Sequence, residues 1–128
     1  MSFLKNIFGS TEEENPKSNI KWDLLTQLNQ LDEMVEVSAT LPVLVFKHST
    51  RCSISRMALK QFEREFDLQG KVVPYFLDLL TYRPISNEIA SRFNVVHQSP
   101  QLIVIKNGEA VYDASHSEIQ VEDLKQFL

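Results

Sequence analysis

The sequence contains a single cysteine, Cys52, and it is the residue best placed for chemistry. It follows an apolar run, Val43–Phe46, and a short polar turn, and a helical pattern of apolar residues begins directly after it. This pattern predicts a thiol in the first turn of a helix, where free N–H groups and the positive end of the helix dipole favour a thiolate. We therefore expect Cys52 to attack a disulfide sulfur and form a mixed disulfide. The alternative is a buried cysteine that serves as a small hydrophobic side chain.

Polar residues before Cys52 are candidates for supporting roles. Lys47 and Arg51 can offset the charge of a thiolate or bind the carboxylates of a thiol cosubstrate, or they are ordinary solvated charges. His48 can support the thiolate as a cation, or it stabilises the loop. Thr50 is expected to shape the turn.

The composition excludes several other classes of site. The chain has 128 residues and a net charge of −4, so we expect one domain and no general attraction to nucleic acid. One cysteine and three scattered histidines give no ligand pattern for a metal, and one cysteine forms no internal disulfide. The sequence has no apolar run of signal-peptide or membrane-span length, so we expect a cytoplasmic protein with no membrane contact.

The elements that must position Cys52 follow from apolar periodicity. Residues 1–19 are expected to be a tail and linker, in which Met1–Phe8 is a short amphipathic stretch that docks somewhere or stays mobile. Residues 20–128 form the predicted domain. Its expected elements are a helix over Trp22–Glu36, a strand at Val43–Phe46, a helix after Cys52 ending near Gly70, a strand over Val72–Asp78, a helix over Pro84–Phe93, a hairpin of Leu102–Ile105 with Ala110–Tyr112, and a helix over Glu118–Leu128.

Two of these elements carry further expectations. The helix after Cys52 is expected to turn Ile54, Met57, Ala58, Phe62 and Phe66 inward. Pro74 indicates a kink or an edge in its strand.

The order of elements predicts an α/β fold with a mixed central sheet and helices on both faces. With a cysteine after the first main strand, Ser99-Pro100 before a hairpin, and Lys106-Asn107-Gly108-Glu109 in its turn, the chain resembles the thioredoxin-like superfamily over residues 22–128.

A closer resemblance rests on the block from Lys47 to Ser55, which reads KHSTRCSIS. This block is similar to the signature of the YtxJ-like monothiol bacilliredoxins, although Ser53 stands where members commonly have proline. The resemblance implies a bacterial, stress-associated protein that transfers disulfides between client proteins and the small thiol bacillithiol or another low-molecular-weight thiol. It implies no bound cofactor, a separate reducing partner, and a monomer or weak dimer.

The resemblance also assigns roles to individual residues. Ser55 stands where dithiol thioredoxins have their second cysteine; its hydroxyl can donate a hydrogen bond to the thiolate, or it satisfies the start of the helix. A hydroxyl cannot displace a mixed disulfide, so another molecule must do so. Phe46 stands where thioredoxins have a buried aspartate. Pro100 is expected to be cis and to face Cys52, and Ser99 to offer its backbone N–H and C=O to a substrate.

Three functions are therefore open. The first is a monothiol thiol-disulfide oxidoreductase acting on protein–small-thiol mixed disulfides. The second is an iron–sulfur carrier of the monothiol glutaredoxin type, which the residues after Cys52 match poorly. The third is a stress-associated interaction module that uses Cys52 little. The rate of reaction of Cys52 with iodoacetamide against pH distinguishes the first from the third.

Overall fold

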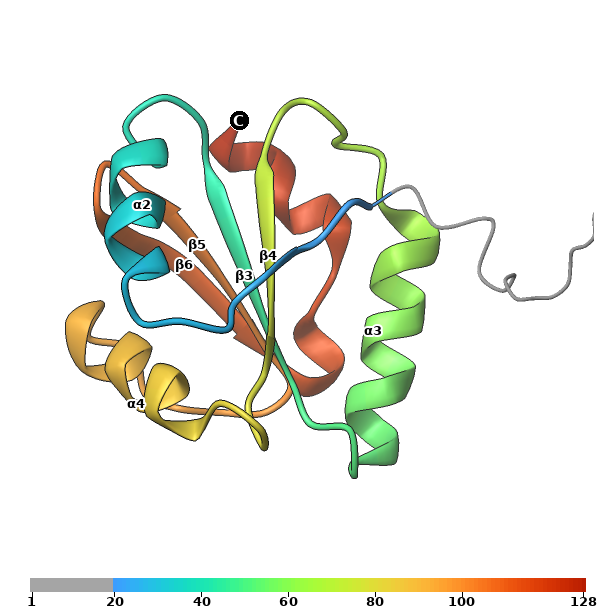
Figure 1. The fold of residues 1–128 in the computed structure, drawn as a ribbon. Helices are drawn as coiled ribbons and strands as arrows, with labels where there is room; N and C mark the ends of the chain where they lie inside the picture. Colours follow the sequence, from blue (N-terminus) through green and yellow to red (C-terminus); the bar gives the residue numbers. More distant parts are fainter. Residues whose placement is uncertain (1–19) are drawn as a thin grey trace, which may run out of the picture.

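One mixed sheet of five strands organises residues 20–128, the part of the chain that this computed structural model describes. The strands are β2 (Asp23–Leu24), β3 (Val43–His48), β4 (Val73–Asp78), β5 (Gln101–Lys106) and β6 (Glu109–Ser115). Their order in the sheet is β2-β4-β3-β5-β6 (Figure 1). The strands β2, β4 and β3 are parallel, whereas β5 pairs antiparallel with both β3 and β6. The predicted α/β fold with a mixed central sheet is confirmed.

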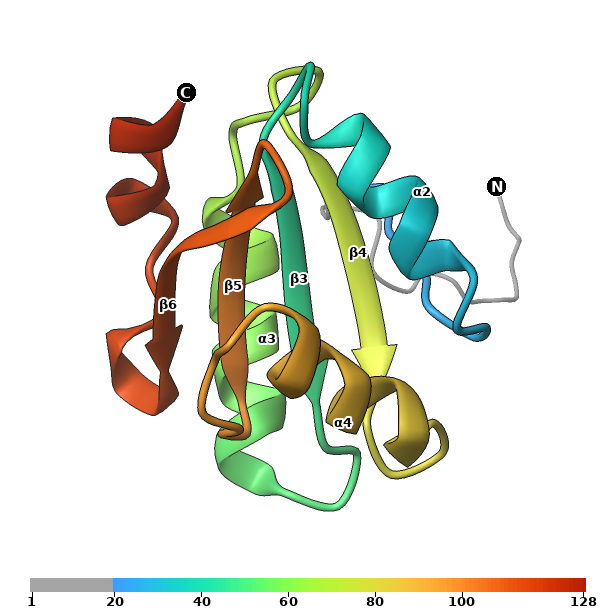
Figure 2. The same ribbon diagram turned by 90° about the vertical axis from the view of Figure 1, so that its left-hand side faces the viewer.

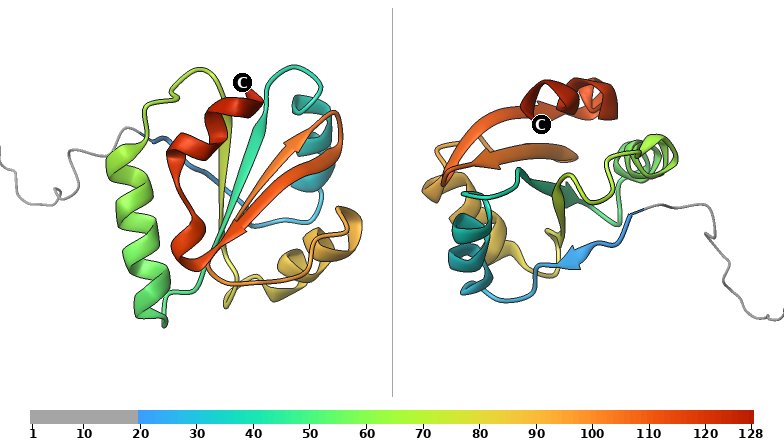
Figure 3. Two further views of the ribbon diagram at one scale, coloured as in Figure 1. Left: turned by 180° about the vertical axis from the view of Figure 1, so that it is seen from behind. Right: turned by 90° about the horizontal axis from the view of Figure 1, so that it is seen from above.

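Helices cover both faces of this sheet (Figures 2 and 3). The helical elements are α2 (Gln30–Val37), α3 (Ser53–Glu65), α4 (Arg83–Arg92) and the 3-10 turns η1 (His116–Glu118) and η2 (Val121–Phe127). Helices α2 and α4 lie on one face, and α3 lies on the other with η1 and η2 (Figure 3). Each face therefore packs its own apolar core against the sheet.

The strand β3 lies at the centre and is buried on both faces along its whole length. Because side chains alternate along a strand, Val45 joins the core under α2 and α4, while Phe46 joins the core under α3. The alternation continues for two residues beyond the predicted end of the strand. It turns Lys47 toward α4 and His48 toward α3, where each makes a side-chain contact described below.

The turn of the β5–β6 hairpin matches its sequence. Asn107 and Gly108 have φ angles of 52° and 78°. Both values lie in the left-handed region that the Asn-Gly pair tolerates, so the predicted hairpin is confirmed. Pro74 lies in β4 opposite Leu44, and β2 pairs with β4 only at Tyr75 and Phe76. The sheet is therefore open beside Pro74, which agrees with the predicted edge.

The predicted helix over Trp22–Glu36 is wrong in its first half, because β2 and a turn occupy that half. The side chain of Gln30 organises the turn. Its Oε1 accepts hydrogen bonds from the N–H groups of Thr26 and Gln27, and its Nε2 donates to the carbonyl of Leu24. An amide side chain thus satisfies backbone groups that a helix would have paired, and α2 begins only at Gln30.

Two further expectations about helices need correction. Ile54 and Met57 do not face the core, since they are 55% and 70% exposed; the buried side chains of α3 are Ser55 and Phe62. The predicted final helix over Glu118–Leu128 is instead the 3-10 element η2, and η1 ends at Glu118. The expectations for the tail and linker concern residues 1–19, which lie outside the described part of the chain.

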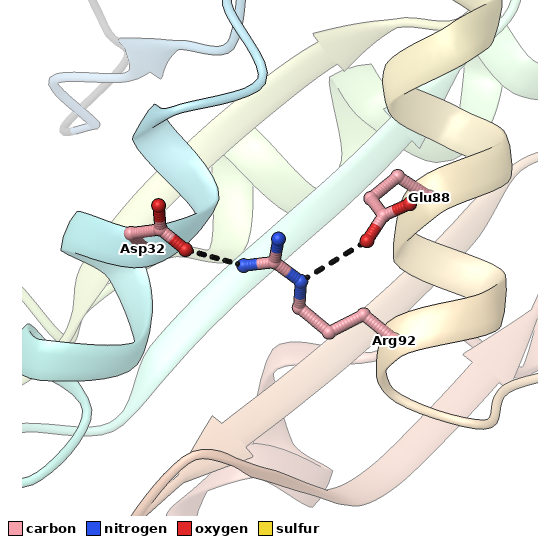
Figure 4. A network of polar contacts seen from close by, with 3 residues as sticks. All are labelled: Asp32, Glu88 and Arg92. Carbon is pink, nitrogen blue, oxygen red and sulfur yellow. Dashed lines mark hydrogen bonds and ion pairs between the residues drawn. The ribbon is translucent and has the colours of Figure 1, made fainter.

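An ion-pair network joins the two helices on the α4 face (Figure 4). Arg92 on α4 donates to Asp32 on α2 at 2.9 Å and to Glu88 on its own helix at 3.3 Å. Because the Asp32 side chain is 75% exposed, we expect this network to orient the helices more than it stabilises them.

Candidate active site

Cys52 lies where β3 passes into α3. It is half-buried and forms the N-cap of α3 in an extended conformation, with φ −108° and ψ 121°. Its N–H donates to the carbonyl of Ser49, and its own carbonyl accepts from the N–H of Arg56. These bonds fix the backbone on both sides of the sulfur, so the predicted strand, turn and helix-start thiol are present.

The loop before β5 lies at the same end of the sheet as the loop that joins β3 to α3 (Figure 2). The register shows this, because Lys47 near the end of β3 pairs with Gln101 at the start of β5. The loop before Gln101 therefore lies beside the loop that carries Cys52. The Ser99–Pro100 peptide bond in that loop is cis, the geometry that the sequence resemblance implies.

Ser55 is fully buried one turn into α3 and is held by two hydrogen bonds. Its Oγ accepts from the N–H of Ser49 at 3.0 Å and lies 2.8 Å from Nδ1 of His48. These bonds join the start of α3, the loop after β3 and the end of β3. The hydroxyl at the position of a second thiol is thus part of a defined polar network.

The surroundings of His48 disfavour its charged form. The residue is only 5% exposed and packs against the ring of Phe76 at 5.5 Å between ring centroids. Burial lowers the pKa of His48; Asp78, its partner on β4, acts to raise the pKa, and Arg56 on α3 acts to lower it. The structure therefore gives His48 a loop-stabilising contact, while a permanently cationic His48 beside the thiolate is disfavoured.

Lys47 lies on the opposite face of β3 and is completely buried. Its Nζ lies 3.4 Å from the carbonyl of Ser86 and 3.3 Å from Nδ1 of His97, which in turn lies 3.3 Å from Oγ of Ser86. Burial, with a smaller contribution from Arg83, lowers the pKa of Lys47 from 10.5 to about 8. Lys47 is therefore neither a solvated charge nor exposed for the expected contact with a cosubstrate carboxylate, because its ammonium contacts α4 and the loop before β5 rather than the surface.

Gln101 and Ser99 complete the loop before β5. Gln101 is fully buried; its Nε2 donates to the carbonyl of Val96, and its Oε1 accepts from the N–H of Gln98. The Oγ of Ser99 is a buried polar atom for which the structure shows no hydrogen-bond partner. Sequence reasoning missed the structural roles of Gln101, Ser86 and His97. No local signal in the sequence indicated these roles; Gln101 stands at the start of β5, directly before its apolar residues.

Comparisons with known proteins agree with this geometry. The sequence profile of the family described as Monothiol bacilliredoxin BrxC matches residues 23–124. The chain belongs to the monothiol bacilliredoxin family.

Solved structures similar to this bacilliredoxin family member share the thioredoxin fold. One, assigned as an oxidoreductase with a thioredoxin fold, is 35% identical with a TM-score of 0.69, covering 80% of this chain and 89% of that chain. Thioredoxin from Malassezia sympodialis is 15% identical with a TM-score of 0.64, and the match covers 91% of this chain and 95% of that chain. Thioredoxin from Fasciola hepatica is 16% identical with a TM-score of 0.61, and the match covers 81% of this chain and 93% of that chain. Family and fold together support a thiol redox function.

An aromatic cluster lies between β3 and α3. Phe46, six residues before Cys52, is fully buried, and its ring contacts those of Trp22 and Phe62. Trp22 also donates a hydrogen bond to Glu63 at 2.7 Å. An apolar aromatic cluster therefore fills the position where the resemblance to thioredoxins would place a buried carboxylate.

The two residues directly before Cys52 are exposed. The backbone carbonyl of Thr50 accepts a hydrogen bond from the guanidinium of Arg56 at 3.1 Å, and the predicted turn-shaping role of the Thr50 side chain stays a prediction. Arg51 projects its charge at the surface next to the cysteine. Its predicted contact with a cosubstrate carboxylate stays a prediction.

Within residues 20–128, no group of three or more His, Cys, Asp or Glu side chains is arranged to hold a metal ion. Over the same residues, no helix has the length and apolar character needed to cross a membrane.

Proposed function

We propose that this chain is a monothiol thiol-disulfide oxidoreductase that removes a low-molecular-weight thiol, such as bacillithiol, from client proteins. The observation that supports this proposal is the position of Cys52. Its half-buried thiol lies at the N-cap of α3, at the same end of the sheet as the Ser99–Pro100 loop. Family membership supports the small thiol as cosubstrate.

The reaction has two exchange steps. In the first, the Cys52 thiolate attacks the small-thiol sulfur of the mixed disulfide, and the client leaves as a thiolate. In the second, a further small-thiol anion attacks the Cys52-bound sulfur, so that a symmetric small-thiol disulfide forms and the Cys52 thiolate is released. Electrons are conserved at each step, and a separate reductase must reduce the symmetric disulfide.

Ser55 accounts for the need for a second thiol molecule. A hydroxyl at this position cannot attack the Cys52 mixed disulfide, and this one is buried and hydrogen-bonded to His48 and Ser49. The mixed disulfide therefore persists until a thiol from solution reaches it.

The polar surface around Cys52 gives the small thiol its contacts. Bacillithiol carries carboxylates, and the exposed guanidinium of Arg51 next to Cys52 is suited to bind one. The backbone N–H and C=O of Ser99 pair with the thiol or with the client backbone. Lys47 acts from beneath by holding His97, and so the loop before β5, in place.

Mass spectrometry tests this proposal. Incubation of the reduced chain with a bacillithiolated client should transfer one bacillithiol to Cys52, and excess bacillithiol should remove it. A Cys52→Ser variant should acquire no adduct. If the wild-type chain acquires none while its Cys52 reacts with iodoacetamide, the proposed cosubstrate is wrong; if Cys52 is inert to both, the interaction module is the better interpretation.

The role of Arg51 can be tested with a matched variant. Arg51→Gln should raise the KM for bacillithiol by roughly tenfold to a hundredfold, since a charge-assisted hydrogen bond contributes about 1.5–3 kcal/mol. Arg64→Gln changes an exposed arginine near the other end of α3 and should leave the KM unchanged. Equal effects of the two substitutions would mean that only overall charge matters.

A further inference from the structure

We propose that His48 controls, through the hydroxyl of Ser55, whether a hydrogen-bond donor is available to the sulfur of Cys52. This inference rests on the proposed function and adds a positioning residue to it. His48 does not touch the substrate; it acts through the orientation of one proton.

Three segments hold the two residues in place. His48 is the last residue of β3, and its carbonyl accepts from the N–H of Leu79. Ser55 lies in the first turn of α3, three residues after the Cys52 N-cap. In the first turn of a helix, the N-cap residue and the third helical residue lie close together, so Ser55, which contacts the imidazole of His48, is also near Cys52.

The hydrogen bonds of Ser55 leave a single choice for its proton. Its Oγ already accepts from the N–H of Ser49, and a hydroxyl has only one proton to donate. If Nδ1 of His48 carries no proton, the hydroxyl donates to it over the 2.8 Å contact. If Nδ1 carries a proton, His48 donates to Oγ, and the hydroxyl proton is free to point toward Cys52.

The charge on Cys52 selects between these two states. While the sulfur is in a thiol or a disulfide, it is a weak acceptor, and the hydroxyl donates to His48. When the sulfur is released as a thiolate, a donor directed at it becomes favourable. His48 then gains a proton at Nδ1, either by moving its own proton from Nε2 through solvent or by taking one from water, and the hydroxyl turns to the thiolate.

The groups around His48 are suited to this change. Asp78 faces His48 from β4 and acts to raise its pKa, whereas Arg56 on α3 acts to lower it. The ring of Phe76 and the side chain of Ser55 also contact the imidazole. Burial lowers the pKa of His48, so the neutral imidazole predominates at neutral pH and can respond to the thiolate. On the other side of β3, Lys47 contacts His97 and not His48.

The test is the rate of reaction of Cys52 with iodoacetamide, measured against pH in the full chain. We compare the wild type with Ser55→Ala and His48→Asn, because an asparagine amide can reach Ser55 without titrating. The control is His116→Asn, an exposed histidine with a φ of 57° that asparagine tolerates. The wild type and the control should show a second inflection on the acid side. Both site variants should lose it, and Ser55→Ala should react roughly threefold or more slowly at neutral pH.

A second measurement needs no substitution. Nitrogen-15 NMR of the wild-type imidazoles should show a change in protonation of Nδ1 of His48 when Cys52 is converted from the reduced form to its methyl disulfide. Identical pH profiles in the wild type and His48→Asn, or an unchanged Nδ1 signal, would overturn the proposal. Neither assay uses bacillithiol, so an intact profile without a bacillithiol adduct would support the His48 role and overturn only the cosubstrate.

Discussion

The buried ammonium of Lys47 gives a prediction that can be worked through quantitatively. Its side chain is 0% exposed, and its polar contacts are the Ser86 carbonyl and Nδ1 of His97, neither of them a carboxylate. Keeping a charge there costs free energy that the unfolded chain does not pay. We therefore expect Lys47→Met, which keeps the length of the side chain without its charge, to change how stability depends on pH.

The magnitude follows from the lowered pKa. In the folded chain the pKa of Lys47 is about 8, against 10.5 for an unperturbed lysine. Between these values the unfolded state binds more protons, so the stability of the wild type rises with pH. At about 1.4 kcal/mol per pH unit, the total is about 3 kcal/mol, of which about 2 kcal/mol appears between about pH 7 and about pH 9.5.

Denaturant unfolding at several pH values measures this effect as a difference between two proteins. Subtracting Lys47→Met from the wild type cancels the other titrating groups, including Tyr75 and Tyr112, whose pKa values are raised chiefly by burial. The difference in unfolding free energy should increase by about 2 kcal/mol in favour of the wild type over that range. Lys60→Met, which changes an exposed lysine on α3, should show a constant difference.

A constant difference for Lys47→Met would refute the reasoning, since it would mean that Lys47 keeps its charge as easily as a surface lysine. The acid side provides an independent check. Burial first, and then Lys47 and Arg83, lower the pKa of His97, so His97 removes stability as pH falls below its unfolded value of 6.5. Removing Lys47 should raise the pKa of His97 and reduce this loss, which NMR titration can measure.

Three further substitutions test the fold by denaturant unfolding. Phe62→Ala should cost about 3–5 kcal/mol, because the ring is 1% exposed in the core under α3; a cost near zero would contradict this packing. Arg92→Ala should cost less than about 1 kcal/mol, since its partner Asp32 is largely exposed, and a larger cost would mean that the network does more than orient helices. Gly108→Ala should cost about 1–2 kcal/mol, because φ is 78° and a Cβ would lie 3.4 Å from Val35; no loss would mean that the turn relaxes.

The sequence predicts the sheet and the place of Cys52 well because both depend on local signals. The apolar run of β3, the Asn-Gly turn and Pro84 at the start of α4 each determine their own conformation. The region of Trp22–Asn29 was mispredicted because Gln30 pairs with backbone groups through its side chain, which apolar periodicity does not reveal. The inner face of α3 was predicted only in part. Phe62 and Phe66 are buried as expected, but Ile54 and Met57 are exposed, and the polar Ser55 is buried in the first turn instead.

The residues behind the site were less predictable, since their roles depend on strand pairing. Nothing near Lys47 in the sequence indicates that His97, fifty positions later, lies against its ammonium. That contact arises because β5 pairs antiparallel with β3 and brings the preceding loop alongside. The contact of His48 with Ser55 arises differently, because the short loop after β3 places the first turn of α3 against the end of that strand.

These contacts make the end of β3 the common support of the whole site. Lys47 reaches one face and contacts His97 in the loop of Ser99 and Pro100, while His48 reaches the other face and contacts Ser55 in the first turn of α3. Neighbouring residues on a strand point to opposite faces, so these two adjacent residues support both faces of the sheet at the end that carries Cys52. An exchange of the two residues should therefore impair the thiol and the proline loop together, although it preserves composition and charge.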